Sequence, residues 1–368
     1  MQFIDLHAQQ KRIRSKIEEK IKKVLDHGQY IMGPEINELE EKLAEFVGTR
    51  YAVGVASGTD ALLIPLMAYD VGQGDAVFTT PFTFIATGEV IRLLGATPIF
   101  VDIQPDTFNL DPAKLEETIQ QVLAQGELTP RGIIPVDLFG QCADYDEIME
   151  IARKYNLFVL QDAAQSFGAL YKNRRACSHG DVAGTSFFPA KPLGAYGDGG
   201  MIFTDNADLY DKFISIRIHG KGSDKYDNVR IGVNGRLDTI QAAILLAKME
   251  IFPEELELRQ EAANRYTAGL RSPVVPPVVK DYNVSAWAQY SLLHPRRDDV
   301  IKKLKEQGIP TAIYYPIPLH LQEAFSNLPC CRGDFPLSED AAARIFSIPM
   351  HPYLSRQDQD KIIEIINL

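Results

Sequence analysis

Four short apolar runs alternate with helical stretches in the first half of the chain, and this alternation constrains the fold most strongly. The runs are AVFTT, TPIFVDI, GIIPVDL and LFVLQDA. Between them lie stretches with helical spacing, such as LDPAKLEETIQQVLAQ and DYDEIMEIARKYN. Strands that alternate with helices are typical of βαβ units, in which helices cover a buried parallel sheet. We therefore predict an α/β fold with a three-layer α/β/α arrangement around a mainly parallel sheet.

The segments on either side of this region predict further helices and a second, smaller domain. Apolar residues recur at helical spacing from Lys11 to His27, which predicts an amphipathic arm that ends at Gly28. A long helical segment is expected from Leu237 to Gln260, and the stretch RSPVVPPVVKDYN then forms a connection. We predict a large domain with its N-terminal arm over residues 1–250 and a small C-terminal α/β domain over residues 251–368.

Composition excludes two classes of partner. The chain has 368 residues, 45% of them hydrophobic, and its formal net charge is -11. Nucleic-acid binding requires clustered Lys and Arg, and no basic run is present, so no nucleic acid is expected. The N-terminal stretch MQFIDLHAQQKRIRSKIEEK lacks the apolar core of a signal peptide, and no apolar stretch is long enough to span a bilayer. We expect a cytoplasmic protein that binds no membrane.

Several common catalytic and metal-binding motifs are missing from the chain. It contains no G-x-G-x-x-G after the first strand, no G-x-x-x-x-G-K-[ST], no G-x-S-x-G and no H-E-x-x-H. The cysteines Cys142, Cys177, Cys330 and Cys331 show no C-x-x-C spacing. Dehydrogenase, P-loop kinase, serine hydrolase and zinc protease functions therefore lose their usual motifs, and no metal site is predicted.

Three short motifs remain, and the first two suggest a phosphate and a ring nitrogen. Ser57-Gly58-Thr59-Asp60 precedes an apolar helix. It is either a helix cap or a phosphate site, since free N–H groups at a helix start attract anions. Asp162 ends the apolar strand VLQD, where ligands bind in open α/β sheets. It is either a turn residue or a buried carboxylate that pairs with a protonated ring nitrogen.

The third motif places Lys191 between an apolar run and the glycine-rich loop GAYGDGG. An amine close to a phosphate-bearing aldehyde forms a Schiff base, and partial burial lowers its pKa enough to make it nucleophilic at neutral pH. A phosphate-type helix start, a strand-end aspartate and a lysine before a glycine loop are together typical of a pyridoxal 5'-phosphate enzyme.

These motifs belong to a longer series of segments that covers nearly the whole chain. The series is GQYIMGPEINELE, SGTDAL, PFTFIATGEVIRLLGATPIFVDI, GQCADYDEI, QDAAQSFGA, SFFPAKPLGAYGDGGMIFT, GVNGRLDTIQAAIL and YYPIPLHLQ. In order and spacing it resembles the DegT-type sugar-nucleotide aminotransferases, which are pyridoxal phosphate (PLP) enzymes of the aspartate aminotransferase fold, fold type I. GQCADYDEI, SFFPAKPLGAYGDGG and GVNGRLDTIQAAIL resemble most the members that aminate a UDP-linked 3-oxo uronate.

The resemblance implies roles for residues around the cofactor. Lys191 would form the Schiff base and shuttle the proton, and Asp162 would pair with the ring nitrogen. Gln165 would hydrogen-bond the ring hydroxyl, and Phe84 would stack on the ring, the alternative for Phe84 being a place in the core. The phosphate would be held by Gly58, Thr59, Ser186 and, from a second subunit, Asn234. The resemblance thus implies a homodimer with shared active sites.

A second set of residues is implied for the sugar nucleotide. Arg236 suits a uronate, because a guanidinium binds a carboxylate through two parallel hydrogen bonds; the alternative is an interface salt bridge. Tyr314 stands where relatives often carry histidine, and His320 either approaches the nucleotide or is simply solvated. The whole set comprises Gly28, Tyr30, Arg236, Tyr314, Tyr315 and His320.

The reaction implied by the resemblance is a ping-pong transamination. L-glutamate supplies the amino group, and 2-oxoglutarate leaves before the oxo sugar enters, with Lys191 as general base and acid. Two alternatives stay open: an aminotransferase for dTDP-linked 3- or 4-oxo-6-deoxy sugars, and a pyridoxal-binding regulatory protein without turnover. Intact Lys191 and Asp162 favour catalysis, because a regulator needs neither.

Overall fold

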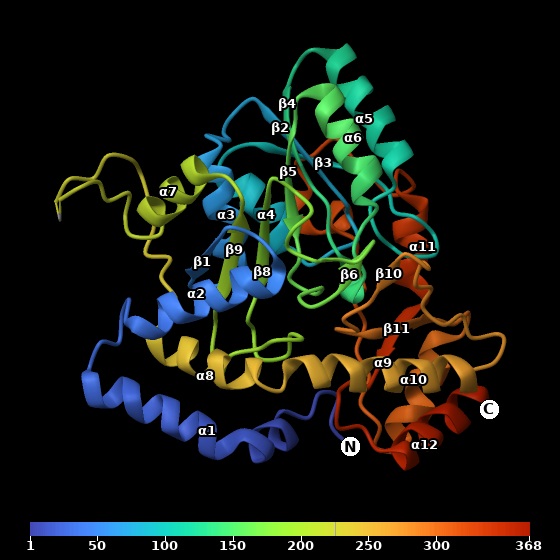
Figure 1. The fold of residues 1–368 in the computed structure, drawn as a ribbon. Helices are drawn as coiled ribbons and strands as arrows, with labels where there is room; N and C mark the ends of the chain where they lie inside the picture. Colours follow the sequence, from blue (N-terminus) through green and yellow to red (C-terminus); the bar gives the residue numbers. More distant parts are fainter. Residues whose placement is uncertain (225) are drawn as a thin grey trace.

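A seven-stranded sheet forms the centre of the computed structural model, which describes residues 1–224 and 226–368 (Figure 1). The pairs from β8 to β3 are parallel, whereas β9 runs antiparallel to both of its neighbours. The prediction of a mainly parallel sheet is confirmed, and each of the four apolar runs forms a strand. The strand order is β1 (Tyr51–Val55), β9 (Gly200–Thr204), β8 (Val182–Ser186), β5 (Phe158–Asp162), β4 (Thr129–Ile134), β2 (Asp75–Thr79) and β3 (Thr97–Phe100).

Helices cover both faces of this sheet and complete three layers. Alternate residues of a strand point to opposite faces. In β9, Met201 and Phe203 therefore pack with α2 (Pro34–Val47) and α8 (Thr239–Met249), while Ile202 packs with α3 (Gly58–Ala68) and α7 (Ala207–Ile216). One face is covered by α3, α4 (Ala86–Leu93) and α7. The other is covered by α2, α5 (Pro112–Gln125), α6 (Tyr145–Tyr155) and α8.

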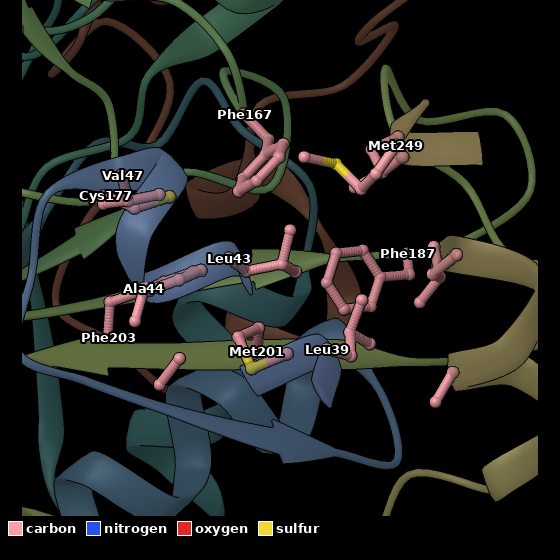
Figure 2. Packing of buried hydrophobic residues seen from close by; sticks show 14 of the residues in the cluster. Leu39, Leu43, Ala44, Val47, Phe167, Cys177, Phe187, Met201, Phe203 and Met249 are labelled. Carbon is pink, nitrogen blue, oxygen red and sulfur yellow. The ribbon is translucent and has the colours of Figure 1, made fainter. Parts of the chain in front are cut away.

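Figure 2 shows the core between the sheet and helices α2 and α8. Leu39 and Leu43 of α2 meet Phe187, Met201 and Phe203 there, and all of these side chains are buried. Burying a side chain of this size contributes roughly 1.5–3 kcal/mol to the free energy of unfolding. This core therefore fixes the position of Phe187, from which the chain leads directly into the Lys191 loop.

The N-terminal helix α1 spans Leu6–His27 and begins five residues before the expected start at Lys11. The cause is Asp5, whose Oδ1 accepts a hydrogen bond from the Ala8 backbone N–H at 2.9 Å. The helix ends as predicted at Gly28, which has φ 71°, a left-handed conformation that favours glycine. Figure 1 shows α1 lying along α8, against which Ile13 and Ile17 are packed.

The long helical segment expected from Leu237 to Gln260 is in fact two helices. α8 ends at Met249, and α9 (Phe252–Gly269) starts after a break at Glu250 and Ile251. Pro253 lies in the first turn of α9, where its missing N–H costs nothing, whereas inside a continuous helix it would remove a hydrogen bond.

The C-terminal part surrounds a small antiparallel pair of strands, β11 (Tyr290–Leu293) and β12 (Ile345–Ile348). Helix α9 supplies Phe252 to the core below the large sheet and Tyr266 to the C-terminal core, so it joins the two regions. The division after residue 250 coincides with the start of this connection and stays a prediction. The surrounding helices are α10 (Arg297–Glu306), α11 (Pro336–Arg344) and α12 (Arg356–Asn367).

The remaining elements are short. A second small sheet contains β10 (Asn283–Val284), β6 (Leu170–Tyr171) and β7 (Arg174–Arg175), and single 3₁₀ turns are η1 (Leu138–Gly140), η2 (Leu319–Leu321) and η3 (Glu323–Phe325). Within the described residues, no helix has both the length and the apolar character needed to cross a membrane.

Candidate active site

Asp162 is the last residue of β5, and the fold buries its carboxylate at the carboxyl edge of the sheet. Its Oδ2 accepts a hydrogen bond from Thr87 Oγ1 at 2.8 Å, and its Oδ1 accepts one from the Ala164 N–H at 3.2 Å. Burial raises the pKa of Asp162, while the two hydrogen bonds and the positive charge of Lys191 act in the opposite direction. The carboxylate is therefore held in one orientation close to a lysine.

Lys191 lies in the loop that connects β8 to β9, and its side chain is half-buried. The start of the loop is closed by a hydrogen bond from the Lys191 N–H to the Phe188 carbonyl at 2.9 Å. Burial lowers the pKa of Lys191, an effect that the charge of Asp162 partly offsets. A lysine with a lowered pKa offers more neutral amine at physiological pH, which is the form that attacks an aldehyde.

Lys248 is a fully buried lysine that supports this loop, and sequence analysis missed it. Its Nζ donates a hydrogen bond to the Gly194 carbonyl at 2.6 Å and lies 4.2 Å from the centre of the Tyr196 ring. Burial lowers the pKa of Lys248 to about 8. Its position had a signal in the sequence, because Lys248 is the one charged residue in the apolar helix TIQAAILLAKM.

The predicted phosphate residues come together at the N-terminus of α3. Ser57 caps this helix by accepting a hydrogen bond from the Asp60 N–H at 3.1 Å, so the interpretation as a cap holds. A Cβ added to Gly58 would lie 2.6 Å from the Cβ of Ser186, and only glycine fits at this contact. Thr59 follows in the same turn. The cap leaves a helix N-terminus flanked by hydroxyl groups, which is a favourable site for a phosphate.

Phe84 and Gln165 both lie beside Tyr315 of the C-terminal part. The Phe84 side chain is 56% exposed, so the alternative place in the core is wrong, whereas Phe82 is fully buried. Its ring lies 6.4 Å from that of Tyr315, centre to centre. Gln165 accepts a hydrogen bond from the Phe139 N–H at 2.8 Å and donates one to the Tyr315 hydroxyl at 3.1 Å. One amide hydrogen of Gln165 is left to donate to a ligand.

These residues fit pyridoxal phosphate. The close contact of Gly58 with Ser186 leaves the N–H groups of α3 next to a serine hydroxyl, as a phosphate requires. Asp162 is a buried carboxylate suited to a protonated ring nitrogen, and Phe84 offers an exposed aromatic face for the ring. Lys191 supplies an amine of lowered pKa.

The remaining predicted residues from the first 250 positions are Gly28, Tyr30, Asn234 and Arg236, and two of them line a surface hollow. A hollow of about 380 Å³ is lined by Asn234 and Arg236 together with Ile31, next to Tyr30 in the chain. The Tyr30 carbonyl accepts a hydrogen bond from the Thr239 N–H at 3.0 Å, which joins the segment after Gly28 to the start of α8. Arg236 forms no ion pair with any other described residue, and its Nε is buried without a partner there.

Two predicted residues of the C-terminal part differ in their surroundings. Tyr314 is half-buried and packs edge-on against Phe3, with 6.3 Å between the ring centres. The His320 side chain is completely buried and its Nε2 lies 3.1 Å from Glu339 Oε1. The expectation of a simply solvated histidine is therefore wrong, and the imidazole has no exposed surface for a nucleotide to contact.

Sequence analysis also missed two polar residues that hold the strand ends. Thr87 bonds to Asp162, as described, and Asp137 is a fully buried carboxylate after β4. It accepts hydrogen bonds from Gln161 Nε2 and Ser166 Oγ, both at 2.7 Å, and thus ties together the chain on either side of Asp162. The sequence signal was its place in PVDL, which ends an apolar run just as QDA does. Burial raises the pKa of Asp137 to about 6.

Known proteins that are similar to this chain match it over nearly its whole length. The family model described as the DegT/DnrJ/EryC1/StrS aminotransferase family matches residues 11–367. A protein of Pseudomonas aeruginosa named UDP-2-acetamido-2-deoxy-3-oxo-D-glucuronate aminotransferase is 50% identical over 357 residues, which cover 96% of each chain. A pleiotropic regulatory protein of Geobacillus stearothermophilus is 40% identical, covering 99% of this chain and 97% of that one. A dTDP-3-amino-3,6-dideoxy-alpha-D-galactopyranose transaminase of Aneurinibacillus thermoaerophilus is 38% identical, covering 99% and 98%.

Solved structures agree with this result. A crystal structure of a DegT DnrJ EryC1 StrS aminotransferase from Brucella abortus superposes with a TM-score of 0.98 at 50% identity, covering 100% of this chain and 98% of that one. The PLP form of a sugar aminotransferase from Streptococcus pneumoniae superposes with a TM-score of 0.88 at 27% identity, covering 96% and 95%. The predicted fold type I is thus confirmed.

Proposed function

Because the chain belongs to the DegT/DnrJ/EryC1/StrS aminotransferase family, we propose that it transfers an amino group from L-glutamate to a UDP-linked 3-oxo sugar. The proposed acceptor is UDP-2-acetamido-2-deoxy-3-oxo-D-glucuronate, on which the 50% identical relative acts. The chain is a pyridoxal phosphate-dependent aminotransferase, as the sequence predicted. The observation that carries the proposed chemistry is the placement of the half-buried Lys191 in the loop after β8, beside β5, whose last residue is the buried Asp162. Burial lowers the pKa of Lys191, which favours the reactive neutral amine.

Each residue of the strand-edge group has a task in this reaction. When bound, pyridoxal phosphate supplies an aldehyde that accepts the amino group and a ring that delocalises the electron pair left behind when a proton is removed. Lys191 Nζ would hold the cofactor through its aldehyde and would act as the general base and acid for the proton shift. Asp162 would keep the ring nitrogen protonated, and Gln165 would donate its free amide hydrogen to the ring hydroxyl. The phosphate is held by Gly58, Thr59 and Ser186.

The second group of residues acts in the site of a partner protomer in this proposal. Asn234 completes the phosphate site, while Gly28, Tyr30 and Arg236 bind the sugar nucleotide. The support is their position: Asn234 and Arg236 line a surface hollow beside Ile31, and among the described residues that lining includes Gly197 and Asp198 of the loop but neither Lys191 nor Asp162. A homodimer with a two-fold axis would bring each group to the other's site. Tyr314 and Tyr315 contact the sugar from the C-terminal part, and His320 is left out because it is buried.

Arg236 is the proposed determinant for the uronate. Its guanidinium forms no ion pair with the described residues, and its Nε is buried without a partner there. It can bind the sugar carboxylate through two parallel hydrogen bonds, a geometry that a neutral hydroxymethyl group cannot match. The two substrates to compare are therefore the UDP-linked 3-oxo uronate and the otherwise identical UDP-linked 3-oxo sugar with a hydroxymethyl group.

The test measures kcat/KM for both sugars, with L-glutamate as donor, in the parent and in Arg236→Gln. A charge-assisted bidentate contact corresponds to roughly 1.5–3 kcal/mol, or about 10- to 100-fold in kcat/KM. We expect the parent to prefer the uronate by this factor and Arg236→Gln to lose the preference while keeping the rate with the neutral sugar. A parent that turns over neither sugar but accepts dTDP-linked substrates would overturn the proposed acceptor.

Two of the relatives correspond to the two alternative functions. The 38% identical dTDP-sugar transaminase favours a dTDP-linked oxo sugar as second candidate, and a panel of UDP- and dTDP-linked sugars separates the two. The 40% identical pleiotropic regulatory protein corresponds to the second alternative, a regulator without turnover. Conversion of the bound cofactor to its amine form by L-glutamate distinguishes an enzyme from a regulator. We place the reaction in the cytoplasm, where nucleotide sugars and glutamate occur, in the synthesis of amino sugars for surface polysaccharides such as the lipopolysaccharide O-antigen.

A further inference from the structure

Thr87 is the side chain that fixes the Asp162 carboxylate from outside its own strand. It lies in the first turn of α4, is fully buried, and donates its hydroxyl hydrogen to Asp162 Oδ2 at 2.8 Å. The other carboxylate oxygen has a backbone donor, the Ala164 N–H, at the longer distance of 3.2 Å. Thr87 therefore forms the shorter of the two hydrogen bonds that orient this carboxylate.

A second threonine directs the hydroxyl of Thr87. Thr83 Oγ1 lies 3.1 Å from Thr87 Oγ1, and both side chains are buried. A threonine hydroxyl has one hydrogen, and that of Thr87 is used for the carboxylate. Thr83 therefore donates to Thr87, and the bonds run in one direction from Thr83 through Thr87 to Asp162. Each hydrogen bond in such a chain polarises the next and strengthens it.

The same turn also carries the exposed aromatic ring of the site. The Thr87 N–H donates to the Phe84 carbonyl at 3.3 Å, so Phe84 and Thr87 begin one helical turn. Phe84 presents its ring to the open side, and Thr87 points into the protein to Asp162. The segment TFIAT thus couples the surface proposed to stack on the cofactor ring to the carboxylate proposed to hold its nitrogen.

We propose that Thr87 is a positioning residue that holds the Asp162 carboxylate ionised and oriented toward the nitrogen of the cofactor ring. This inference rests on the proposed role of Asp162 as the partner of that nitrogen. The competing explanation is purely structural: the hydrogen bond would only attach α4 to β5. The two differ in one respect, because a structural bond affects every ligand of the site equally, whereas a positioning bond matters only for a ligand with a ring nitrogen.

The experiment compares two ligands and three variants of the full chain after removal of bound cofactor. The ligands are pyridoxal phosphate and its 1-deaza analogue, in which a carbon replaces the ring nitrogen. The variants are Thr87→Val, which removes the hydroxyl at constant shape, Thr87→Ser, which keeps it, and Thr79→Val. Thr79 is the matched control, because it is equally buried on β2 but donates to the Ile134 carbonyl at 2.8 Å instead of to Asp162.

Dissociation constants measured by cofactor fluorescence distinguish a positioning role of Thr87 from a purely structural one. Loss of a hydrogen bond to a charged group corresponds to about tenfold or more in affinity. Thr87→Val should weaken pyridoxal phosphate binding by about that factor and leave the affinity for the deaza analogue unchanged. Thr87→Ser and Thr79→Val should bind both ligands as the parent does. Equal weakening for both ligands, or no weakening for either, overturns the proposal. If Thr87→Val does not fold, Thr87→Ala compared with Thr87→Ser gives the same test.

Asp162→Asn separates this inference from the proposed function. If Asp162→Asn loses pyridoxal phosphate affinity selectively and Thr87→Val does not, the role of Asp162 stands and only the role of Thr87 is overturned. If Asp162→Asn binds both ligands as the parent does, the assignment of Asp162 itself is wrong. The transamination proposed for the chain is tested independently by the glutamate half-reaction of the unmodified protein.

Discussion

At the carboxyl edge of the sheet, Asp162 and Gln165 have hydrogen-bond partners within the same chain. The side chains of Arg236 and Asn234 on the neighbouring surface have none among the described residues. Asp162 is bound by Thr87, and Gln165 by Phe139 and Tyr315. Arg236 is half-buried, and its Nε has no partner. Burying a polar group without a partner is costly. The difference supports the proposal that the second group serves a ligand or a second protomer.

Lys191→Ala is expected to have the largest effect, because it removes the reactive group of the strand-edge group. Both half-reactions should fall to background, since no other described residue at the strand edge supplies an amine for the proton transfer. Cofactor binding should survive through the proposed contacts of Gly58, Thr59 and Ser186 to the phosphate. Borohydride reduction of the native protein, followed by peptide mapping, checks the assignment.

Lys248 is the internal control for that labelling, because it is a second buried lysine with a lowered pKa. Its amine is already bonded to the Gly194 carbonyl and is enclosed by α8 and the loop. The reduced cofactor should therefore be found on the peptide of Lys191 and not on that of Lys248. Label on Lys248, or a Lys191→Ala variant that still transaminates, would remove Lys191 from the mechanism.

The two regions also differ in how far the sequence could predict them. Buried parallel strands appear as continuous apolar runs, so β2 to β5 and the strand-end residue Asp162 could be predicted from local pattern. Lys191 could be predicted from its place between an apolar run and a glycine loop. Thr87 could not, since its bond to Asp162 joins residues 75 positions apart. The antiparallel direction of β9 is equally non-local, because it depends on pairing with β1 and β8.

The predicted helix boundaries were wrong for more local reasons. The start of α1 is set by Asp5, a cap that lies well before the first residue of the apolar pattern. The break between α8 and α9 lies at Glu250 and Ile251, just before Pro253, in a stretch whose apolar spacing is otherwise continuous. In the second region, Arg236 and Asn234 could be assigned only through the family resemblance. No sequence pattern of one chain records which surface a second copy covers.

Mixed dimers test whether the second region serves a partner protomer, and their effect is the next largest. Lys191→Ala should be inactive, and Arg236→Ala should lose about 10- to 100-fold in kcat/KM with the uronate. When the two are unfolded, mixed in equal amounts and refolded, random pairing makes half of the dimers mixed. One site of each mixed dimer carries both lesions, and the other has an intact lysine and an intact arginine, so about a quarter of all sites should become active.

The control for this mixing experiment is Lys191→Ala combined with Asp162→Asn. Both residues belong to the strand-edge group, so every site of a mixed dimer keeps one lesion and activity should not return. If Lys191→Ala and Arg236→Ala likewise restore nothing, although separate affinity tags show that mixed dimers have formed, then Arg236 acts within its own chain. That outcome would remove the distinction between the two regions.

The smallest expected effect is on protein stability. It is tested by comparing variants of two neighbouring arginines, Arg217 and Arg236. The Arg217 carbonyl accepts a hydrogen bond from the Gly235 N–H at 3.0 Å, so Arg217 and Arg236 lie in adjacent segments. Arg217 is buried and its Nη1 lies 2.5 Å from Glu40 Oε1 and 2.9 Å from the Gly54 carbonyl.

Arg217→Ala leaves the Glu40 carboxylate buried without its cation, which costs about 3–5 kcal/mol in the free energy of unfolding. Arg236→Ala breaks no ion pair within the described chain and should change that free energy by about 0.5 kcal/mol or less. Urea denaturation at one fixed protein concentration measures both, since the stability of a dimer depends on concentration. A loss for Arg236→Ala as large as that for Arg217→Ala would mean that Arg236 stabilises its own protomer, and its unpaired guanidinium would no longer point to a ligand.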